Sequence, residues 1–356
     1  MARTAEAQAG PPRSLLGEVK DAVTPRATLL VIGVTVLQLL FIASYVGALH
    51  HPKPKDVAFG VVAPGGAADR TVARLERLPG KPLDPRALSD EATARERIAN
   101  RDIDGALLVD PDGTTDTLLI ASGGGKTLSN ALISLITELE KDEGRTVRTV
   151  DVAPADAQDA NGLTPFYLVV GWCVGGYLCA SALAISAGAR PAGLRRAVIR
   201  LATMALVSIV GGLGGAVIVG PVLGALPGSV AALWGLGALI TFAVGAATLA
   251  LQCVFGIVGI GVAVLLVVIL GNPSAGGALP PPMLPPFWKA IGPALPPGAG
   301  TWSARSIAYF KTNNVTTPLL TLAAWALLGS AITLAAGARR TRPRLQGRGK
   351  RRNLLS

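Results

Sequence analysis

The chain has 356 residues, of which 50% are hydrophobic, 15% are charged and 4% are aromatic, and its formal net charge is +11. A typical soluble domain carries about 25% charged residues, whereas residues 201–288 contain no Asp, Glu, Lys or Arg. This composition excludes a soluble globule, a collagen-like fibre and a disordered chain, and it predicts a polytopic membrane protein.

The first predicted membrane helix covers residues 27–49 and follows a cytoplasmic N-terminal segment, residues 1–26. A cleaved signal peptide is the alternative, because Val46, Gly47 and Ala48 resemble the small residues of a cleavage site. The apolar core is longer than the ~7–15 residues usual for such peptides, so an uncleaved membrane anchor is favoured.

Residues 50–163 are predicted to form an extracytoplasmic α/β domain, inserted between the first and second spans. Their 14 basic and 19 acidic side chains give an acidic excess, which suits a domain carried across the membrane. The turn at Asp110–Gly113 predicts a hairpin, and Ser89 is expected to cap a helix. The predicted strands are 57–63, 104–109, 117–121 and 146–152, and the predicted helices are 68–78, 89–100 and 128–139. This alternation predicts a small sheet covered by helices.

The sequence shows no arrangement typical of catalysis, a cofactor or a metal. Gly123–Thr127 resembles part of a phosphate-binding loop, but Ile120 occupies the position where that loop needs its first glycine. We therefore expect a turn followed by a helix start. Adjacent histidines such as His50 and His51 point in different directions and make a poor chelating pair. The three cysteines fall in predicted spans and are expected to pack there. No enzyme activity, cofactor or metal site is expected.

Residues 164–338 are predicted to form a membrane domain of five further helices. A helix needs about 20 residues to cross ~30 Å of hydrocarbon, so the apolar segment 230–271 fits two spans joined by a tight turn near Gln252. The predicted spans are 165–187, 201–223, 230–250, 253–271 and 318–338. The predicted fold class is an α-helical polytopic membrane protein with six transmembrane helices and the α/β domain inserted after the first.

Positive side chains predict the orientation. They gather in the N-terminal segment, in a loop at Arg190–Arg200 and in a basic tail, residues 339–356. Lys and Arg beside short loops mark the cytoplasmic side, and all three clusters share one side only with six crossings. We expect a multi-pass plasma-membrane protein with cytoplasmic N- and C-termini. The tail is expected to lie against anionic headgroups. Nucleic-acid binding is disfavoured, because no recognition motif accompanies the charge.

The predicted spans contain no Asp, Glu, Lys or Arg, and the chain has no ATPase signature. Ion-coupled carriers usually keep an ionisable group at membrane depth, so transport by this chain would need energy from a separate polypeptide. Glycines recur at helical spacing in the spans. They predict close packing of helices, with sliding helices or a dimer interface as the functional alternatives.

A proline-rich outer loop, residues 272–316, is the most distinctive segment of the sequence. Its prolines preclude one regular helix, and aromatic residues such as Phe287 and Trp288 favour the headgroup level of a bilayer. We expect the loop to fold back onto the membrane surface, with short helices near 286–291 and 303–310. A rigid extracellular linker is the alternative.

The loop contains a distinctive set of residues, which are Asn272, Pro273, Gly276, Gly277, Phe287, Trp288, Pro296, Gly298 and Arg305. In these residues it resembles the outer loop of actinobacterial ABC-2-type membrane proteins akin to the phage infection protein group. The layout is also similar, with one helix, a large outer domain containing the strand residues Asp104–Leu107, and then five helices.

The resemblance implies a permease subunit of an exporter, which works with a separate cytoplasmic ABC ATPase and is usually a homodimer. Leu15–Val23 and the loop at Arg190–Arg200 are the candidates for a cytoplasmic coupling helix. The expected function is export of an amphipathic or envelope-related molecule from the lipid bilayer. The alternative is a membrane-anchored surface protein that binds or organises envelope components and transports nothing.

Overall fold

The computed structural model describes residues 24–352, and their side chains as far as Arg340 apart from Arg26. The candidate coupling helix at Leu15–Val23 and the basic side chains of the tail beyond Arg340 lie outside the described residues. The chain divides into two compact units, residues 1–43 and 44–356. The account below concerns the second unit, apart from the helix that begins in the first.

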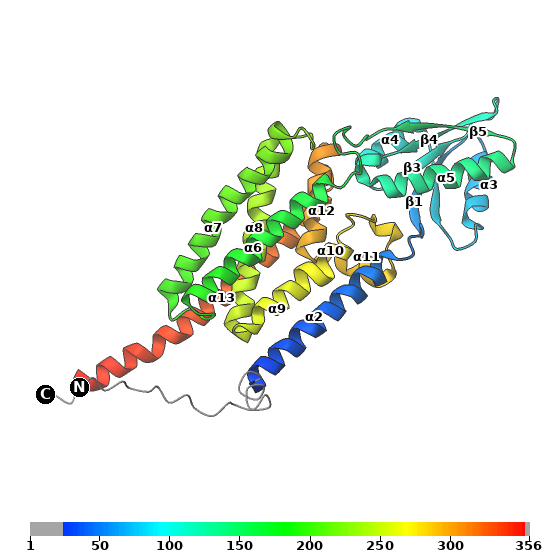
Figure 1. The fold of residues 1–356 in the computed structure, drawn as a ribbon. Helices are drawn as coiled ribbons and strands as arrows, with labels where there is room; N and C mark the ends of the chain where they lie inside the picture. The colour runs from blue at the N-terminus through cyan, green and yellow to red at the C-terminus, as the bar shows by residue number, and fades with distance from the viewer. Residues whose placement is uncertain (1–23, 353–356) are drawn as a thin grey trace, which may run out of the picture. The chain divides into compact units, whose positions relative to one another are not determined.

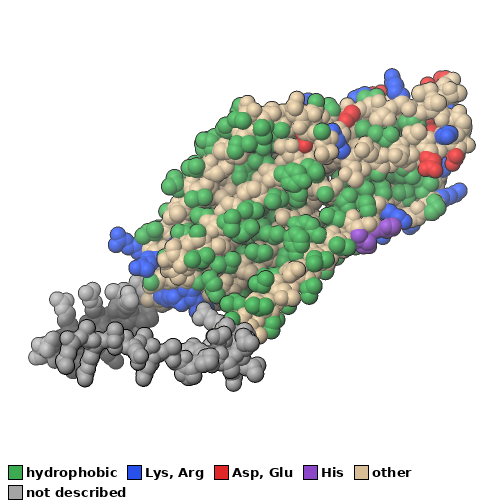
Figure 2. Space-filling view, viewed as in Figure 1, with side chains coloured by type: hydrophobic (Ala, Val, Ile, Leu, Met, Phe, Trp, Pro, Cys, Tyr) green, Lys and Arg blue, Asp and Glu red, His purple; other side chains and the backbone are tan. Residues whose placement is uncertain are grey.

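Within residues 24–352, five helical segments are long and apolar enough to span a membrane, which indicates a multi-pass membrane protein. They belong to α2 (Pro25–Leu49), α6 (Thr164–Ala187), α7 (Leu194–Val217), α8 (Val230–Phe255) and α13 (Thr316–Arg352). A π-helical turn, Ile218–Val222, continues α7. Figure 2 shows a largely hydrophobic surface over these helices, with Lys and Arg gathered at the end where α6 is joined to α7.

The structure corrects the division of the long apolar segment. The turn lies at Gly256, which has φ +64° and follows α8, and not near Gln252. Gln252 is fully buried within α8 and donates a hydrogen bond to the carbonyl of Ala180 at 3.2 Å. The chain continues as α9 (Val258–Val264), a π-helical stretch Leu265–Gly271 and α10 (Asn272–Ser274). Together they make an apolar helix, Val258–Ser274, that is shorter than the five spans.

A second correction concerns the arginines predicted to lie in a loop at 190–200. Helix α7 begins at Leu194, so Arg200 lies within a span and is only 5% exposed. Its guanidinium donates to the carbonyls of Ala187 and Gly188, at 2.9 and 2.5 Å, where α6 ends. A buried arginine is tolerated here because it satisfies carbonyl groups that lack a partner at a helix C-terminus.

Glycines bring α6, α7 and α8 into close contact. A Cβ at Gly212 of α7 would lie 2.5 Å from the backbone nitrogen of Ala238, and one at Gly176 of α6 would lie 2.6 Å from the carbonyl oxygen of Thr241. Only glycine permits this backbone approach, and close backbone packing is a main source of helix association in lipid. The predicted role of the glycines in packing is confirmed at these positions.

The α/β domain contains a five-stranded sheet of order β2-β1-β3-β4-β5 (Figure 1). Its strands are β1 (Val57–Val62), β2 (Leu83–Leu88), β3 (Gly105–Leu108), β4 (Thr115–Ile120) and β5 (Thr146–Asp151). Strands β3 and β4 form the predicted antiparallel hairpin, and the other pairs are parallel. The prediction missed β2, which contains Pro85; a proline is tolerated because β2 lies at the sheet edge.

Three helices cover the two faces of the sheet. They are α3 (Ala67–Glu76), α4 (Glu91–Ala99) and α5 (Lys126–Asp142). Alternate strand residues face opposite sides, so Leu118 packs in the core beneath α3 and α5 while Leu119 packs in the core beneath α4. The cap of α4 is Asp90 rather than Ser89, because the Asp90 carboxylate accepts from the Thr93 N–H at 2.7 Å.

The proline-rich segment packs inside the protein, which corrects the expectation of a loop on the membrane surface. Trp288 joins the core beneath α3 and α5, and Phe310 joins the core beneath α4. The segment contains α11 (Pro286–Ile291), as predicted, and α12 (Pro296–Tyr309), which begins earlier than predicted. Prolines in the first turn of α12 are compatible with a helix because those positions need no N–H partner.

Adjacent glycines on α7 test the packing. We expect Gly212→Ala to destabilise the detergent-solubilised protein by about 1–3 kcal/mol, because the added Cβ overlaps the α8 backbone. Gly211→Ala is the matched control: a Cβ there meets no atom within 4 Å, and the change is expected to be neutral or to stabilise by up to about 1 kcal/mol. Thermal unfolding monitored by tryptophan fluorescence measures both. Equal shifts in the two variants would contradict this account of the interface.

Candidate functional site

The candidate site lies where the α/β domain meets the helices. One end of the sheet faces this junction. The amino ends of β1 and β3 lie there beside the carboxyl ends of β4 and β5. After β4, the Gly123 N–H donates to the Ala153 carbonyl at 2.8 Å, and a Cβ at Gly123 would lie 2.6 Å from the ring of Tyr309 on α12. The glycine-rich turn therefore lets α12 approach this end of the sheet. The helix predicted to start after the turn is α5.

The structure brings only part of the predicted loop motif together. Arg305 meets Gly276 and Gly277, whereas Phe287 is 58% exposed and packs its ring edge against Trp288, at 5.0 Å between ring centroids. The other motif residues have structural positions: Asn272 and Pro273 in α10, Pro296 at the start of α12, and Gly298 packed on the backbone of Gly292.

Arg305 is the centre of the junction. It is 2% exposed, and its guanidinium donates to the carbonyls of Gly276 at 2.6 Å and Gly277 at 2.9 Å. A third carbonyl, that of Gly162 just before α6, lies 3.4 Å from Nη2. The Nε atom is buried and has no hydrogen-bond partner. Burial lowers the pKa of Arg305 to about 10, although the nearby Asp159 opposes the shift. The side chain remains a cation near neutral pH.

Arg101 brings a second, half-buried cation from the α/β domain. It follows α4 with φ +61°, a conformation that few non-glycine residues adopt. Its guanidinium carbon lies 3.4 Å from the ring centroid of Trp302 and 4.8 Å from that of Phe310. It also donates to the Trp302 carbonyl at 2.9 Å and the Ser306 hydroxyl at 2.7 Å. Burial lowers the pKa of Arg101 to about 9, and repulsion from Arg305 adds to the shift.

Further contacts fix the domain to the helices. The Asn313 amide donates to the Ala99 carbonyl and to the Asn100 side chain, both at 3.1 Å. The Tyr309 hydroxyl donates to the Asp159 carboxylate at 3.1 Å, and Asp159 in turn accepts the N–H groups at the start of α6. These bonds join α4, α12 and α6 into one structure.

A cavity of about 300 Å³ opens at this junction. Three cations from three parts of the chain line it: Arg101 of the α/β domain, Lys289 of α11 and Arg305 of α12. Among the described residues, no Asp or Glu lines the cavity. A neighbouring cavity of about 190 Å³, lined by Asp104, shares Arg101 and Trp302 with it. Chemically, the larger cavity is suited to bind an anionic group by charge-assisted hydrogen bonds.

Sequence reasoning found Arg305 but missed Arg101 and Lys289. The face of α12 carries a readable signal, since Trp302, Arg305 and Tyr309 recur at helical spacing. Arg101 has no such signal, because its role depends on tertiary packing against α12. In the described part of the chain, no group of three or more His, Cys, Asp or Glu could hold a metal ion.

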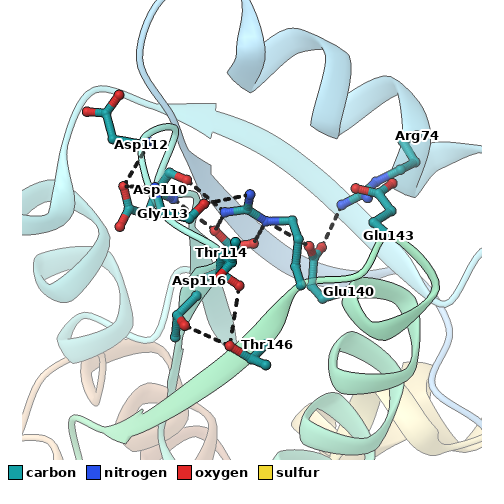
Figure 3. Close-up of polar contacts among 11 residues, drawn as sticks. Arg74, Asp110, Asp112, Gly113, Thr114, Asp116, Glu140, Glu143 and Thr146 are labelled. Carbon is teal, nitrogen blue, oxygen red and sulfur yellow. Dashed lines mark hydrogen bonds and ion pairs between the residues drawn. The ribbon is translucent and has the colours of Figure 1, made fainter.

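A second group of buried ionisable side chains lies within the α/β domain (Figure 3). Asp116 is fully buried and accepts two hydrogen bonds from Arg145, at 2.6 and 2.7 Å. Arg145 also donates to the carbonyls of Asp110 and Gly113 in the hairpin turn. Glu140, 1% exposed, accepts from Arg74 at 2.6 Å.

The two buried carboxyl groups of this network differ in acidity. Burial opposes ionisation of Asp116, but the hydrogen bonds from Arg145 outweigh it and the pKa of Asp116 lies below its ordinary value. Burial raises the pKa of Glu140 in spite of the nearby Arg74. Because these side chains hold the β3–β4 turn and the end of α5 to one another, we assign the network to stability.

Asp116→Ala tests the network. The substitution removes a buried acceptor from the Arg145 guanidinium and from the Asp110 N–H, so we expect a loss of about 1–3 kcal/mol in the free energy of unfolding. Asp112→Ala is the matched control, because Asp112 lies exposed in the same turn, and its effect is expected within about 0.5 kcal/mol of zero. Both are measured by denaturant or thermal unfolding of the full chain in detergent. A similar small effect of both variants would refute the assignment.

Asp104 gives a pH-dependent prediction. Burial raises its pKa to about 6, although Arg101 and Lys289 oppose the shift. The folded state therefore favours the protonated carboxyl, and stability present below about pH 4 is lost as the pH rises through about 6.

Asp104→Asn should remove this loss. Compared with the unsubstituted protein, we expect the variant to be equally stable near about pH 4 and about 1 kcal/mol more stable at about pH 7, since the partly exposed carboxyl keeps some hydration. Unfolding temperatures across this range measure the difference. The exposed neighbour Asp102→Asn should keep the original pH profile, and a pH-independent effect of Asp104→Asn would contradict the prediction.

No protein-family model, curated protein or solved structure matches the chain.

Proposed function

We propose that this chain is a six-span, permease-like protein of the plasma membrane, related to the ABC-2-type family, that exports an anionic amphipathic molecule with the help of a separate ATPase. The observation that carries the proposal is the cavity lined by Arg101, Lys289 and Arg305, shared between the α/β domain and the membrane helices. A binding site placed there is contacted by both parts, so a movement of the helices would alter it.

The segment Val258–Ser274 is proposed as the sixth crossing. It starts beside the end of α8, where the Arg190 guanidinium donates to the Val254 carbonyl at 2.9 Å. It ends at Ser274, which lines the cavity at the junction. The segment therefore runs from one end of the bundle to the other. At 1.5 Å per residue it extends about 26 Å, close to the ~30 Å of hydrocarbon.

Basic side chains support a cytoplasmic assignment for the end of the bundle away from the cavity. Arg190, Arg195 and Arg196 lie between α6 and the first turn of α7. The last part of α13 reaches the same end, since a Cβ at Gly337 would lie 3.1 Å from the Gly193 carbonyl oxygen. By the positive-inside rule this end faces the cytoplasm, and the α/β domain then lies outside.

The contacts at the junction also favour a second candidate function. Arg101 is stacked on Trp302 and hydrogen bonded to α12, and Asn313 is bonded to α4. A domain so firmly seated suits a membrane-anchored surface protein that binds an envelope component and transports nothing.

Topology can be measured with reporter fusions. We expect a reporter at residue 100 to be active outside the cytoplasm and a reporter after Ser356 to be active inside it, because six crossings place the C-terminus with the positive clusters. A reporter in the Gly188–Gly193 connection should agree with the one after Ser356. The six-span proposal fails if residue 100 and Ser356 report the same compartment.

Co-purification distinguishes the two functions. The full chain is solubilised in mild detergent, captured, and assayed for vanadate-sensitive ATP hydrolysis against an unrelated captured membrane protein. A bound ATPase whose hydrolysis is stimulated by the chain supports the permease. An absence of ATPase from the native complex, in membranes where the chain is abundant, supports the surface protein instead.

A further inference from the structure

The cavity at the junction is lined by positive side chains and, among the described residues, by no carboxylate. Of its lining residues Arg101, Lys289 and Arg305 are cations, and the nearby carboxylates of Asp104 and Asp159 do not line it. Arg305 is 2% exposed and its Nε has no partner. A buried N–H without an acceptor costs free energy.

An apolar groove lies between α8 and α13. Its volume is about 450 Å³, and the groove is lined by Ala247, Ala250, Leu251, Ala324, Leu328 and Ile332. It lies on helices that carry the composition of membrane spans. Such a mainly apolar groove on a membrane-embedded surface is suited to a hydrocarbon chain.

Cavity and groove follow one another along α13. Thr317 lines the cavity, and Thr321, one turn later, lines the groove. Trp325 lines the groove one turn further on, and its indole N–H donates to the Ala294 carbonyl at 2.8 Å. The part of α13 that lines the cavity and the groove, from Thr317 to Ile332, is about 23 Å long at 1.5 Å per residue. This length exceeds the ~15 Å of hydrocarbon in one leaflet, so it is sufficient for a lipid of that leaflet.

We propose that the cavity and the groove together bind one phospholipid with an anionic headgroup. The headgroup phosphate contacts Arg101, Lys289 and Arg305, and an acyl chain lies in the groove between α8 and α13. An anionic lipid is favoured over a zwitterionic one, because among the described residues no carboxylate lines the cavity to receive an ammonium group. The inference deepens the proposed function by naming a substrate class, and it rests on the orientation proposed above, which places the cavity at the outer leaflet.

The test uses brominated lipids, which quench tryptophan fluorescence on contact. Trp302 lines the cavity and Trp325 lines the groove. The full chain is purified in mild detergent, stripped of lipid, and titrated with phosphatidylglycerol or phosphatidylcholine carrying bromine on the acyl chains. We expect saturable quenching by phosphatidylglycerol, at a concentration about tenfold lower than that needed for phosphatidylcholine. Equal quenching by the two lipids would overturn the proposal.

Headgroup variants test the cavity. Lys289→Gln is the first choice, because Arg101 and Arg305 also donate hydrogen bonds that hold the junction. We expect it to weaken phosphatidylglycerol binding about three- to fivefold, with no change in unfolding temperature. The matched control is Lys53→Gln, an exposed lysine that does not line the cavity, and it should bind as the unsubstituted protein does. Equal effects of Lys289→Gln and Lys53→Gln would overturn the headgroup assignment.

Groove variants test the acyl chain. Ala324→Phe should fill the groove and abolish most of the quenching, whereas Leu327→Phe, on a side chain that is 70% exposed and outside the groove lining, should leave it unchanged. Two results together would overturn the proposal in favour of a soluble anion. Inorganic phosphate alone would displace the brominated lipid, and the Ala324→Phe variant would still bind that lipid fully.

Lipid binding is measured in detergent and needs no ATPase, so its failure leaves the co-purification result intact. A missing ATPase likewise leaves the lipid titration intact.

Discussion

Hydrocarbon surrounds the membrane helices, and this requires every backbone polar group of the bundle to find a partner within the protein or at the membrane surface. The interior of each helix meets the requirement through its own hydrogen bonds, but the last carbonyls of a helix cannot. At the ends of α6 and α8 the structure supplies Arg200 and Arg190 for this purpose. The same positive charges that predict membrane orientation thus complete the ends of two spans.

The proline-rich segment creates the opposite need at the other end of the bundle. It forms only short helices, so several of its carbonyl groups lack the partner that a regular helix would give them. Arg305 supplies donors to two of them, at Gly276 and Gly277. The segment therefore depends on a buried cation, and that cation leaves positive potential in the space beside it. Part of the positive charge that lines the cavity therefore follows from how the segment is held together.

The sequence predicts the local features of this fold better than those that depend on tertiary packing. Strands β1, β3, β4 and β5 alternate or run apolar strongly enough to be found, while β2 was missed because Pro85 masks a strand that only an edge position tolerates. The break after α8 lies four residues beyond the predicted turn near Gln252, because that amide is buried against α6 and Gly256 makes the turn. At the site, Arg305 belonged to a motif, whereas the role of Arg101 depends on packing that no local pattern records.

The chain enters the α/β domain at the amino end of β1 and leaves it at the carboxyl end of β5, and both lie at the same end of the sheet. Helix α12 packs against this end. Helix α12 also packs against α6, α8 and α13. A tilt of these spans would therefore displace α12, and with it Trp302 and Arg305 relative to Arg101. Because Arg101 and Arg305 repel each other, an anion bound between them would reduce the repulsion and stabilise the junction. Binding of an anion would thereby favour the helix arrangement that keeps α12 against the α/β domain.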